Sequence, residues 1–579
     1  MAAFGKLKRG SVQLQRAAIK ASGRIGARHV MVGMVVLGLL LSGFVERSAS
    51  VALLSLSDPL SSADFAEYVT NTSYVTQYCA SFNDTNDLDV GADPEDGGLE
   101  EEITDFEQED DDSFEGNGTT HVGHGRHIVA DPPLKVPFSE NEGLDFRLRE
   151  MFLWGTLFAP LPSSRLTAKV GPVRIFGIGI LGAGALAVFV PFGAWFSSYH
   201  ITIRFVQGLF TGSTWPALHM LAASWFPPLQ RSGFVSCYSA VSVGHAMAGL
   251  LGTPLVLALG RDSLCYLLAT LTLLWAMGWW ILVRESPAEH PRLSDEQRRH
   301  LQRAIGPGLS ARNAVPPPPW RRLLSSLPVW ACAMATLGSH WGQATLQLAV
   351  TKYLMLVYGF ALRYDRVLSV LPHFGHFLAA LTFGRVVDHV RGQALVSTTT
   401  ARKLLVYISH FLPGAVLFVV GYSGCDPATP AAIYTAAVVV SGATAAGVYS
   451  SAVDVAPNFA GTVFGLSQTF GAAGSLAASY VVKEGLHGSL PGSWRLVFGV
   501  AAFVLAFTAT VFMAIGSGSV QPWNYSPNQR AAAQEPASED EAEERETAAS
   551  SVVVDTASVS QQPPETSSTT KAATMTTAL

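Results

Sequence analysis

The chain has 579 residues, of which 49% are hydrophobic and 14% are charged, whereas a soluble domain carries about 25% charged residues. This composition excludes an ordinary soluble protein and predicts an integral membrane protein whose main partner is the lipid bilayer, and nothing in it indicates nucleic-acid binding. The net charge of −6 comes mainly from two polar segments, and five cysteines in so long a chain do not make a disulfide scaffold.

The N-terminal residues 1–29 hold seven basic residues and no acidic one, which predicts a cytoplasmic location. The apolar run at 30–45 also fits the core of a signal peptide, with a cleavage site at 48–50. The basic region is too long for that reading, and the apolar pattern resumes at 51–56. We therefore expect a first transmembrane helix, interrupted in its apolar pattern by Glu46 and Arg47.

Residues 58–145 form a polar, acidic insert with three N-glycosylation sequons, at Asn71, Asn83 and Asn117. Its low hydrophobicity predicts a disordered loop on the extracellular or luminal side. The insert has three closely spaced histidines, but no fixed geometry would hold them, so we predict no metal site.

Eleven further apolar segments have membrane-spanning length. They lie near 147–166, 173–195, 198–222, 236–259, 263–283, 328–350, 366–386, 402–422, 430–452, 460–482 and 494–516. The intervening basic loops then fall in the cytoplasm with both termini. The predicted organisation is a basic tail at 1–29, an N-terminal transmembrane half at 30–283, a cytoplasmic central loop at 284–327, a C-terminal half at 328–516 and a disordered cytoplasmic tail at 517–579.

The segment that starts at Arg204 carries the strongest functional signal. A charge inside a membrane helix costs about 2.5–3.5 kcal/mol on insertion and normally faces a water-filled pathway. Gly208 and Gly212 allow close approach of a neighbouring helix, and Pro216 can bend the segment. Arg204 is therefore a candidate for binding an anion.

A formal dinucleotide-binding motif, GIGILG at 177–182, lies inside a continuous apolar run without a preceding strand. We interpret these glycines as helix-packing residues. The chain has no phosphate-binding P-loop, no nucleophile elbow and no HExxH motif, so we predict that it is not an enzyme.

Several motifs resemble one family. They are GSTWPALHMLAASWFPPLQRS at 212–232, RESPAEHPRLSDEQRRHLQRAIG at 284–306, PWRRLLSSLPVWA at 319–331, STTTARK at 397–403, VDVAPNFAGTVFGLSQ at 453–468 and QPW at 521–523. The sequence resembles the anion transporters of the major facilitator superfamily that comprise sodium-phosphate cotransporters, sialin and vesicular glutamate transporters (solute carrier family 17). The resemblance covers residues 151–523 and the first segment. It implies an all-α membrane protein with twelve transmembrane helices in two six-helix halves.

The family's recurring arginines correspond to Arg47 and Arg204. A guanidinium has a planar fork of donors that suits carboxylate or phosphate oxygens. The alternative for either residue is a structural role as partner of a buried acid or carbonyl. Glu46 is a neighbouring acid and a coupling candidate, although it should point about 100° away from Arg47 on a helix.

Three departures from the family bear on the substrate. Ser339 replaces an arginine of the glutamate transporters, Thr211 replaces a glutamate of sialin and its relatives, and Arg149 replaces a histidine of the glutamate branch. These differences favour the phosphate and organic-anion branch. Thr211 follows Arg204 by seven residues, so it shares a helix face with Arg204 and becomes a candidate for binding substrate or sodium.

Other residues have weaker signals. His219 and His340 are coupling candidates, with a hydrogen bond between helices as the alternative. Two short cytoplasmic loops form a faint internal repeat, and four of their residues are predicted to take part in gating. One acidic residue after the tenth segment is a fifth gating candidate. The alternative is that these charges only set the membrane topology. These gating candidates are Lys169, Arg174, Asp388, Arg391 and Asp454. Cys79 and Cys425 are both expected outside the cytoplasm and are a candidate disulfide.

The predicted function is secondary active transport of a small anion, inorganic phosphate or an organic anion, by alternating access. The alternatives are a sialin-like proton-coupled transporter of acidic sugars or amino acids, a transport-dead receptor or scaffold that works through the insert, and an anion channel. We expect no cofactor other than a co-transported sodium ion or proton, and a monomer. The tails have no acidic dileucine signal, which favours the plasma membrane over lysosomal or vesicular membranes.

Overall fold

The computed structural model describes most of the expected membrane part of the chain. The described ranges are 26–54, 140–193, 197–305, 317–358, 362–422, 428–487 and 491–525, and within them the chain forms helices and connecting turns without strands. The predicted glycosylation sites Asn71, Asn83 and Asn117 lie outside the described residues, as do Cys79 and Cys425.

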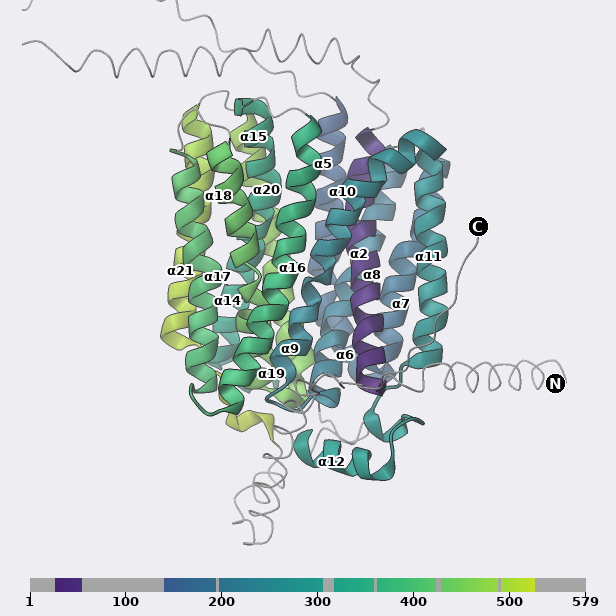
Figure 1. Ribbon diagram of the computed structural model, residues 1–579, viewed down its shortest axis with the longest axis vertical. Coiled ribbons are helices and arrows are strands. Elements are labelled where there is room, and N and C mark those ends of the chain that lie inside the picture. Colours follow the sequence, from purple (N-terminus) through teal and green to yellow (C-terminus); the bar gives the residue numbers. More distant parts are fainter. Residues whose placement is uncertain are drawn as a thin grey trace, which may run out of the picture.

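The N-terminal half contains six long helical segments (Figure 1). They are α2 (Ala27–Leu54), α5 (Glu140–Phe158) with α6 (Pro160–Val170), α7 (Pro172–Ala185) with the 3-10 helix η1 (Leu186–Gly193), α8 (Ser197–Trp225), α9 (Arg231–Ser236) with η2 (Cys237–Ser239) and α10 (Ala240–Leu259), and α11 (Arg261–Leu282). The charges at Glu46 and Arg47 do not break α2, because both residues lie inside a continuous helix.

The C-terminal half repeats this plan. Its segments are α14 (Leu327–Thr345) with the π-helical η5 (Leu346–Val350) and α15 (Thr351–Tyr358), α16 (Leu362–Gly392), α17 (Thr398–Val420), α18 (Ala428–Val440) with η6 (Ala445–Tyr449) and α19 (Ser450–Val455), α20 (Ala460–His487), and α21 (Pro491–Ile515). The predicted central loop contains η3 (Pro287–Glu289), α12 (Asp295–Ile305) and α13 (Trp320–Leu324). In Figure 1, α12 lies below the bundle, at the end where α2 begins.

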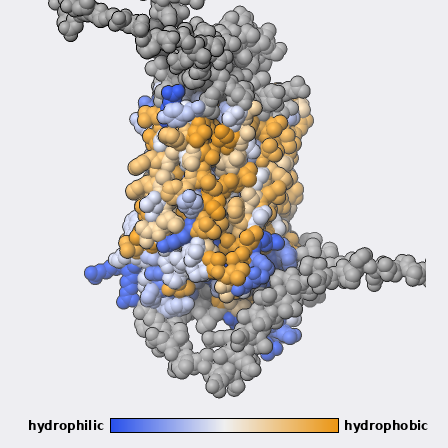
Figure 2. Space-filling view, turned by 60° about the vertical axis from the view of Figure 1, so that its left-hand side comes forward, coloured by the Kyte–Doolittle hydropathy of each residue, from blue (hydrophilic) through white to orange (hydrophobic). Residues whose placement is uncertain are grey.

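Eight helical segments within the described residues are long and apolar enough to cross a membrane. Figure 2 shows the result as a broad hydrophobic belt, with hydrophilic residues gathered toward the lower end. The four other predicted spans are also helical and correspond to α5 with α6, α8, α14 and α20. These helices carry buried polar residues such as Arg204, Ser339 and Gln468, which lower their hydropathy. Their crossing of the membrane and the cytoplasmic position of both termini stay predictions.

The internal repeat is clearer in the packing than in the sequence. In the N-terminal half α2 packs against α10, α5 against α8, and α7 against α11; in the C-terminal half α14 packs against α20, α16 against α18, and α17 against α21. Each pair in one half has the counterpart expected from a six-helix repeat. The halves meet mainly where α10 packs against α16 and where α20 packs against α5 and α8. Polar residues between the halves are therefore positioned by both.

Two glycine pairs bring the helices of the N-terminal half into backbone contact. A Cβ atom on Gly43 of α2 or on Gly244 of α10 would overlap the carbonyl oxygen of the facing helix, and the same holds for Gly155 of α5 and Gly208 of α8. Such small residues allow close helix packing where lipid provides no hydrophobic driving force. The contacts hold α2, α5, α8 and α10 together just below the charged residues described next. The glycines at 177–182 likewise face Trp279 and Phe210, as expected for packing residues.

After α21 the chain folds back onto the end of the bundle. The backbone nitrogen of Gln521 donates to Val455 (2.9 Å), and that of Asn458 donates to the Asn524 side chain (3.0 Å). Trp523 packs against Phe459, with ring centroids 6.1 Å apart. The QPW motif thus fastens the segment that follows α21 to the junction of α19 and α20.

We expect Gly244→Ala to lower the melting temperature by several degrees, because its methyl group overlaps the backbone of α2. Gly33→Ala is the matched control in α2, since nothing lies within 4 Å of a Cβ there and alanine favours a helix over glycine by about 1 kcal/mol. Thermal unfolding of the purified protein in detergent measures both. Equal melting temperatures for the two variants would contradict the packing argument.

Candidate substrate-binding site

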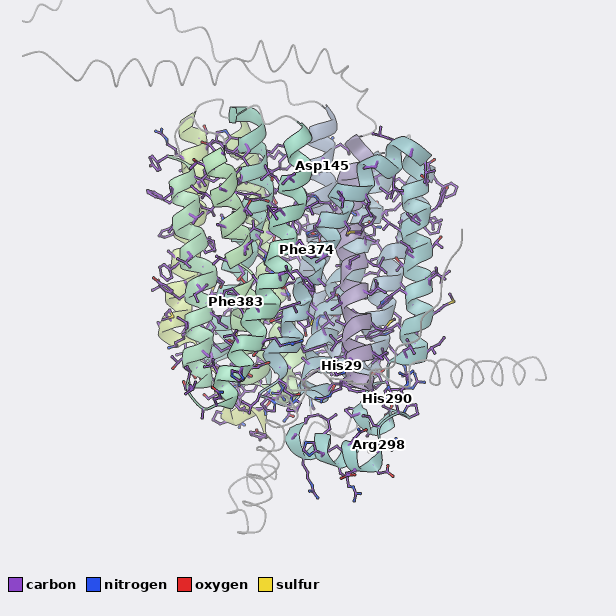
Figure 3. The ribbon with its side chains drawn as sticks, viewed as in Figure 1. His29, Asp145, His290, Arg298, Phe374 and Phe383 are labelled. Carbon is purple, nitrogen blue, oxygen red and sulfur yellow. The ribbon has the colours of Figure 1, made fainter. Side chains whose placement is uncertain are left out.

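A small charged cavity of about 20 Å³ lies between the helices of the N-terminal half and η5 of the C-terminal half. Its lining consists of Glu46, Arg47, Asp145, Leu148, Arg149, Phe152, Leu153, Arg204, His245 and Gln347. Asp145 lies toward the upper end of the bundle in Figure 3, whereas His290 and Arg298 of the central loop lie at the lower end. The cavity is thus on the side opposite the predicted cytoplasmic loop.

The lining combines three arginines with two carboxylates and one histidine. The carboxylate of Glu46 lies 3.2 Å from the imidazole Nε2 of His245, which comes from α10. With His245 neutral, the lining has one net positive charge. Such a charge inside a membrane protein favours a negatively charged ligand.

Arg204 is buried and uses its terminal nitrogens on the protein. One of them donates to the carbonyl of Val45 (3.2 Å) and to Gln207 (3.0 Å), and the other donates to the carbonyl of Glu46 (2.6 Å). The guanidinium also lies over the ring of Phe152, 4.7 Å from its centroid. In this conformation Arg204 therefore has the structural contacts that the sequence left open as its alternative role. It fixes α2 at the turn that carries Glu46 and Arg47.

Arg47 and Arg149 have different surroundings from Arg204. Among the described residues, neither guanidinium makes a hydrogen bond or an ion pair shorter than 4.0 Å with the protein, and Nε of Arg149 is buried without a partner. Their positive charges are close enough to repel each other. In the sequence, Arg149 was noted only as a substitution for a family histidine, although its charge near a predicted membrane segment was a signal for a site residue.

Thr211 lies two turns along α8 from Arg204, but it does not line the cavity. Its side chain is buried, and its hydroxyl has no hydrogen-bond partner. The shared helix face therefore does not bring Thr211 to the charged cluster in this conformation.

His219 and His340 meet a common residue, Tyr449, in the middle of the bundle. Nε2 of His219 lies 3.0 Å from the carbonyl of Tyr449, and Nε2 of His340 lies 3.3 Å from its hydroxyl. His219 also stacks on Phe464. Both histidines are outside the cavity lining. The imidazole in the cavity belongs instead to His245, which the sequence did not single out because a lone histidine in an apolar segment does not show its partner.

At the lower end of the bundle the two halves are joined through Asp388. Its carboxylate accepts the backbone N–H groups of Gly233 (2.7 Å) and Ser232 (3.3 Å), so it caps the start of α9. Arg391 lies 3.6 Å from the same carboxylate and donates to the carbonyl of Pro228 (3.3 Å). A carboxylate at a helix N-terminus is stabilised by the unpaired amides there. These contacts join the two halves at this end of the molecule, where gating stays a prediction.

A second ion pair lies at the same end, and it also joins the two halves. Nε of Arg402 donates to Asp454 (2.8 Å), and Nη1 of Arg402 donates to the hydroxyl of Ser232 (2.9 Å). Both members of the pair are buried. Arg402 in α17 was not among the sequence candidates, because it stands at the start of an apolar segment where a basic residue also fits a topological role.

Lys169 and Arg174 do not mirror Asp388 and Arg391. Both are exposed, and the side-chain hydrogen bond of Arg174 goes to its own helix turn, at Val170. At this turn the acidic group is Glu285, whose carboxylate accepts the backbone N–H of Val173 (3.0 Å). The sequence repeat drew attention to the turn that holds Lys169 and Arg174, and the structure adds the carboxylate of Glu285 there. A gating role at this turn stays a prediction.

Comparison with known proteins places the chain in a family. Residues 151–479 match the Major Facilitator Superfamily. The chain belongs to this superfamily. Within it, human sialin is 28% identical over 374 residues, which are 64% of this chain and 75% of sialin, and bovine vesicular glutamate transporter 2 is 30% identical over 419 residues, which are 70% of each chain. The chain is thus a member of the family of sialin and the vesicular glutamate transporters, and it is not an enzyme.

Two solved structures show that the major facilitator fold is shared more widely. The human organic anion transporter MFSD10 (TETRAN) aligns with a TM-score of 0.51 at 15% identity, covering 84% of this chain and all of that chain (100%). The proton:xylose symporter XylE aligns with a TM-score of 0.55 at 15% identity, covering 85% of this chain and 97% of that chain. The predicted fold and family are therefore confirmed.

We expect Asp388→Asn to open the lower end of this major facilitator protein, because the amides of α9 lose a charged acceptor, and a hydrogen bond to a charged group contributes about 1.5–3 kcal/mol. The buried thiol of Cys237, which lies in η2 just after α9, reports the opening. With the other four cysteines replaced by serine, a permeant maleimide should label Asp388→Asn several-fold faster than the parent protein.

The control for this measurement is Asp295→Asn, which removes an exposed carboxylate from α12. It should leave the labelling rate unchanged. Equal labelling rates in Asp388→Asn and the parent would show that Asp388 does not hold the closure.

Proposed function

We propose that this protein is a secondary active transporter that moves a small anion by alternating access, with the charged cavity as its substrate site. The observation that carries the proposal is the cluster of Arg47, Arg149 and Arg204, which come from three helices and outnumber the two carboxylates beside them. A guanidinium keeps its charge at any physiological pH and matches carboxylate or phosphate oxygens. An apolar or cationic substrate would leave this charge uncompensated.

Because the two halves are joined at the lower end, the anion first enters the cavity from the upper end. The anion enters from the side of Asp145, and Arg47 binds it while Arg204 holds α2 in place. Binding lowers the free energy of a state in which the halves close over the cavity, and the contacts of Asp388 then separate at the other end. The ligand moves the equilibrium only through its different affinity for the two states.

The coupling ion is proposed to act at Glu46. Its carboxylate shares the cavity with the arginines and pairs with His245. A proton or a sodium ion there reduces repulsion between the carboxylate and the incoming anion. His219 and His340 support this role less well, since their contacts are with Tyr449 outside the cavity. The carboxylate–imidazole pair favours a proton, which supports a proton-coupled transporter like the sialin alternative.

The proposal also covers the membrane in which the protein works and its oligomeric state. Relatives named vesicular glutamate transporters support a vesicular membrane, in preference to the plasma membrane that the tail sequences favoured. We propose a monomer as the working unit. The location can be checked by imaging the full-length protein with a small epitope tag beside markers of each membrane.

We expect Arg47→Ala and Arg204→Ala to abolish uptake for different reasons. Arg47 makes no hydrogen bond or ion pair within the described residues and lies in the same cavity as Arg149, so its loss should not lower the melting temperature. Arg204→Ala removes donors from two carbonyls of α2 and should also lower the melting temperature by several degrees. Labelled phosphate, sulfate and organic anions are offered to proteoliposomes, with melting temperatures measured in parallel. Arg322→Ala, which removes an exposed arginine, is the control. Wild-type uptake in Arg47→Ala would contradict the site.

We expect Glu46→Gln to uncouple transport from the driving ion, because an amide pairs with His245 but does not take up a proton or sodium. Uptake by the wild type should increase under an inward proton gradient more than under a sodium gradient. In Glu46→Gln the gradient should have no effect, while exchange of labelled for unlabelled anion continues. An undiminished response to the gradient would move the coupling site elsewhere.

A further inference from the structure

The donors that remain available for a ligand are not spread evenly over the three arginines. Both terminal nitrogens of Arg204 are bound to α2 or to Gln207. Arg47 and Arg149 have no such contacts within the described residues. Nε of Arg204 also lacks an acceptor, but it is buried. An anion in the cavity therefore finds terminal guanidinium nitrogens without protein acceptors on α2 and α5. Two guanidinium groups from different helices can each bind one edge of a small oxyanion.

The two open arginines are also unfavourable neighbours without a ligand. Both line the same small cavity, where like charges repel each other more strongly than in water. Asp145 attracts Arg149 from the same helix, four residues earlier, but it leaves the pair of arginines in excess. A bound anion between Arg47 and Arg149 removes the repulsion and stabilises the contact between α2 and α5.

The charge of the lining indicates how many negative charges the ligand brings. Three arginines and the carboxylates of Glu46 and Asp145 leave one net positive charge. The coupling proton proposed above for Glu46 raises this to two. A doubly charged anion then neutralises the cavity, whereas a singly charged anion leaves one positive charge in the closed protein. Uncompensated charge inside a membrane protein is costly.

We propose that the site selects a doubly charged small oxyanion, and that Arg149 is the residue that sets this selectivity. The inference rests on the proposed function and adds the charge class of the substrate. Sulfate, hydrogen phosphate and short dicarboxylates share the required chemistry, because each presents two charges on oxygens within reach of two guanidinium groups. Arg149 acts by direct contact with the anion, while Arg204 acts on α2.

Binding is tested on the purified full-length protein in detergent at fixed pH and ionic strength, by thermal shift titration. Sulfate and succinate are the dianions, and lactate and nitrate are the monoanions. We expect wild-type protein to bind the dianions at least about tenfold more tightly, given the strength of charged hydrogen bonds. Arg149→Gln should lose this preference but still bind lactate through Arg47. Comparison of sulfate with succinate separates inorganic from carboxylate ligands.

Two further variants keep the test decisive. Arg149→Lys retains the charge and should keep part of the preference, which separates a charge effect from a packing defect. Arg322→Gln removes an exposed arginine of α13 and should behave as wild type. Equal affinities for dianions and monoanions in the wild type, or a wild-type preference in Arg149→Gln, would overturn this inference while leaving the proposed function standing. Absence of any anion uptake by wild-type proteoliposomes would overturn both.

Discussion

The hydrogen bonds from Arg204 to the carbonyls of Val45 and Glu46 are the interaction on which the upper part of the molecule depends. A guanidinium buried among apolar helices needs acceptors, and the backbone of α2 supplies them. The consequence is geometric, because α2 is fixed at the turn where its two charged side chains enter the cavity. The glycine contacts between α5 and α8 then bring Arg149 to the same place.

The two ends of the bundle use charge in opposite ways. At the lower end, charges are matched: Asp388 meets the amides of α9, and Arg402 meets Asp454. In the cavity, positive charge exceeds negative charge, and two arginines have no acceptor among the described residues. Charges at the lower end are therefore paired within the protein, whereas the positive charge of the cavity is not fully balanced. A substrate that supplies the missing charge favours closure there, at the cost of the contacts below.

The sequence predicted well the features that depend on local composition. The helices follow from the length of the apolar segments, and the family resemblance agrees with them. The charges inside two of these segments singled out Arg47 and Arg204, whose roles in binding stay predictions. Features that depend on tertiary neighbours were harder to predict. His245 and Arg402 are ordinary residues until their partners, Glu46 and Asp454, are seen beside them.

The repeat also predicted a gate at Lys169 and Arg174, whereas the carboxylate at that turn comes from Glu285, far along the chain. Thr211 shows a related limit. Its spacing along α8 was correctly related to Arg204, but the cavity ends before Thr211 is reached. Spacing along one helix defines a face, and the depth of a cavity is set by side chains from the other helices.

The fold-back after α21 joins the segment that follows the last helix to the junction of α19 and α20, next to the proposed gate. Gln521 and Asn524 bind the junction of α19 and α20, a few residues from Asp454. Any group attached after residue 525 is therefore close to the contacts between the two halves at the lower end. A fluorophore at this point would sense each opening of the lower end through its changing surroundings. A partner protein that bound the C-terminal tail would act directly at this end of the bundle.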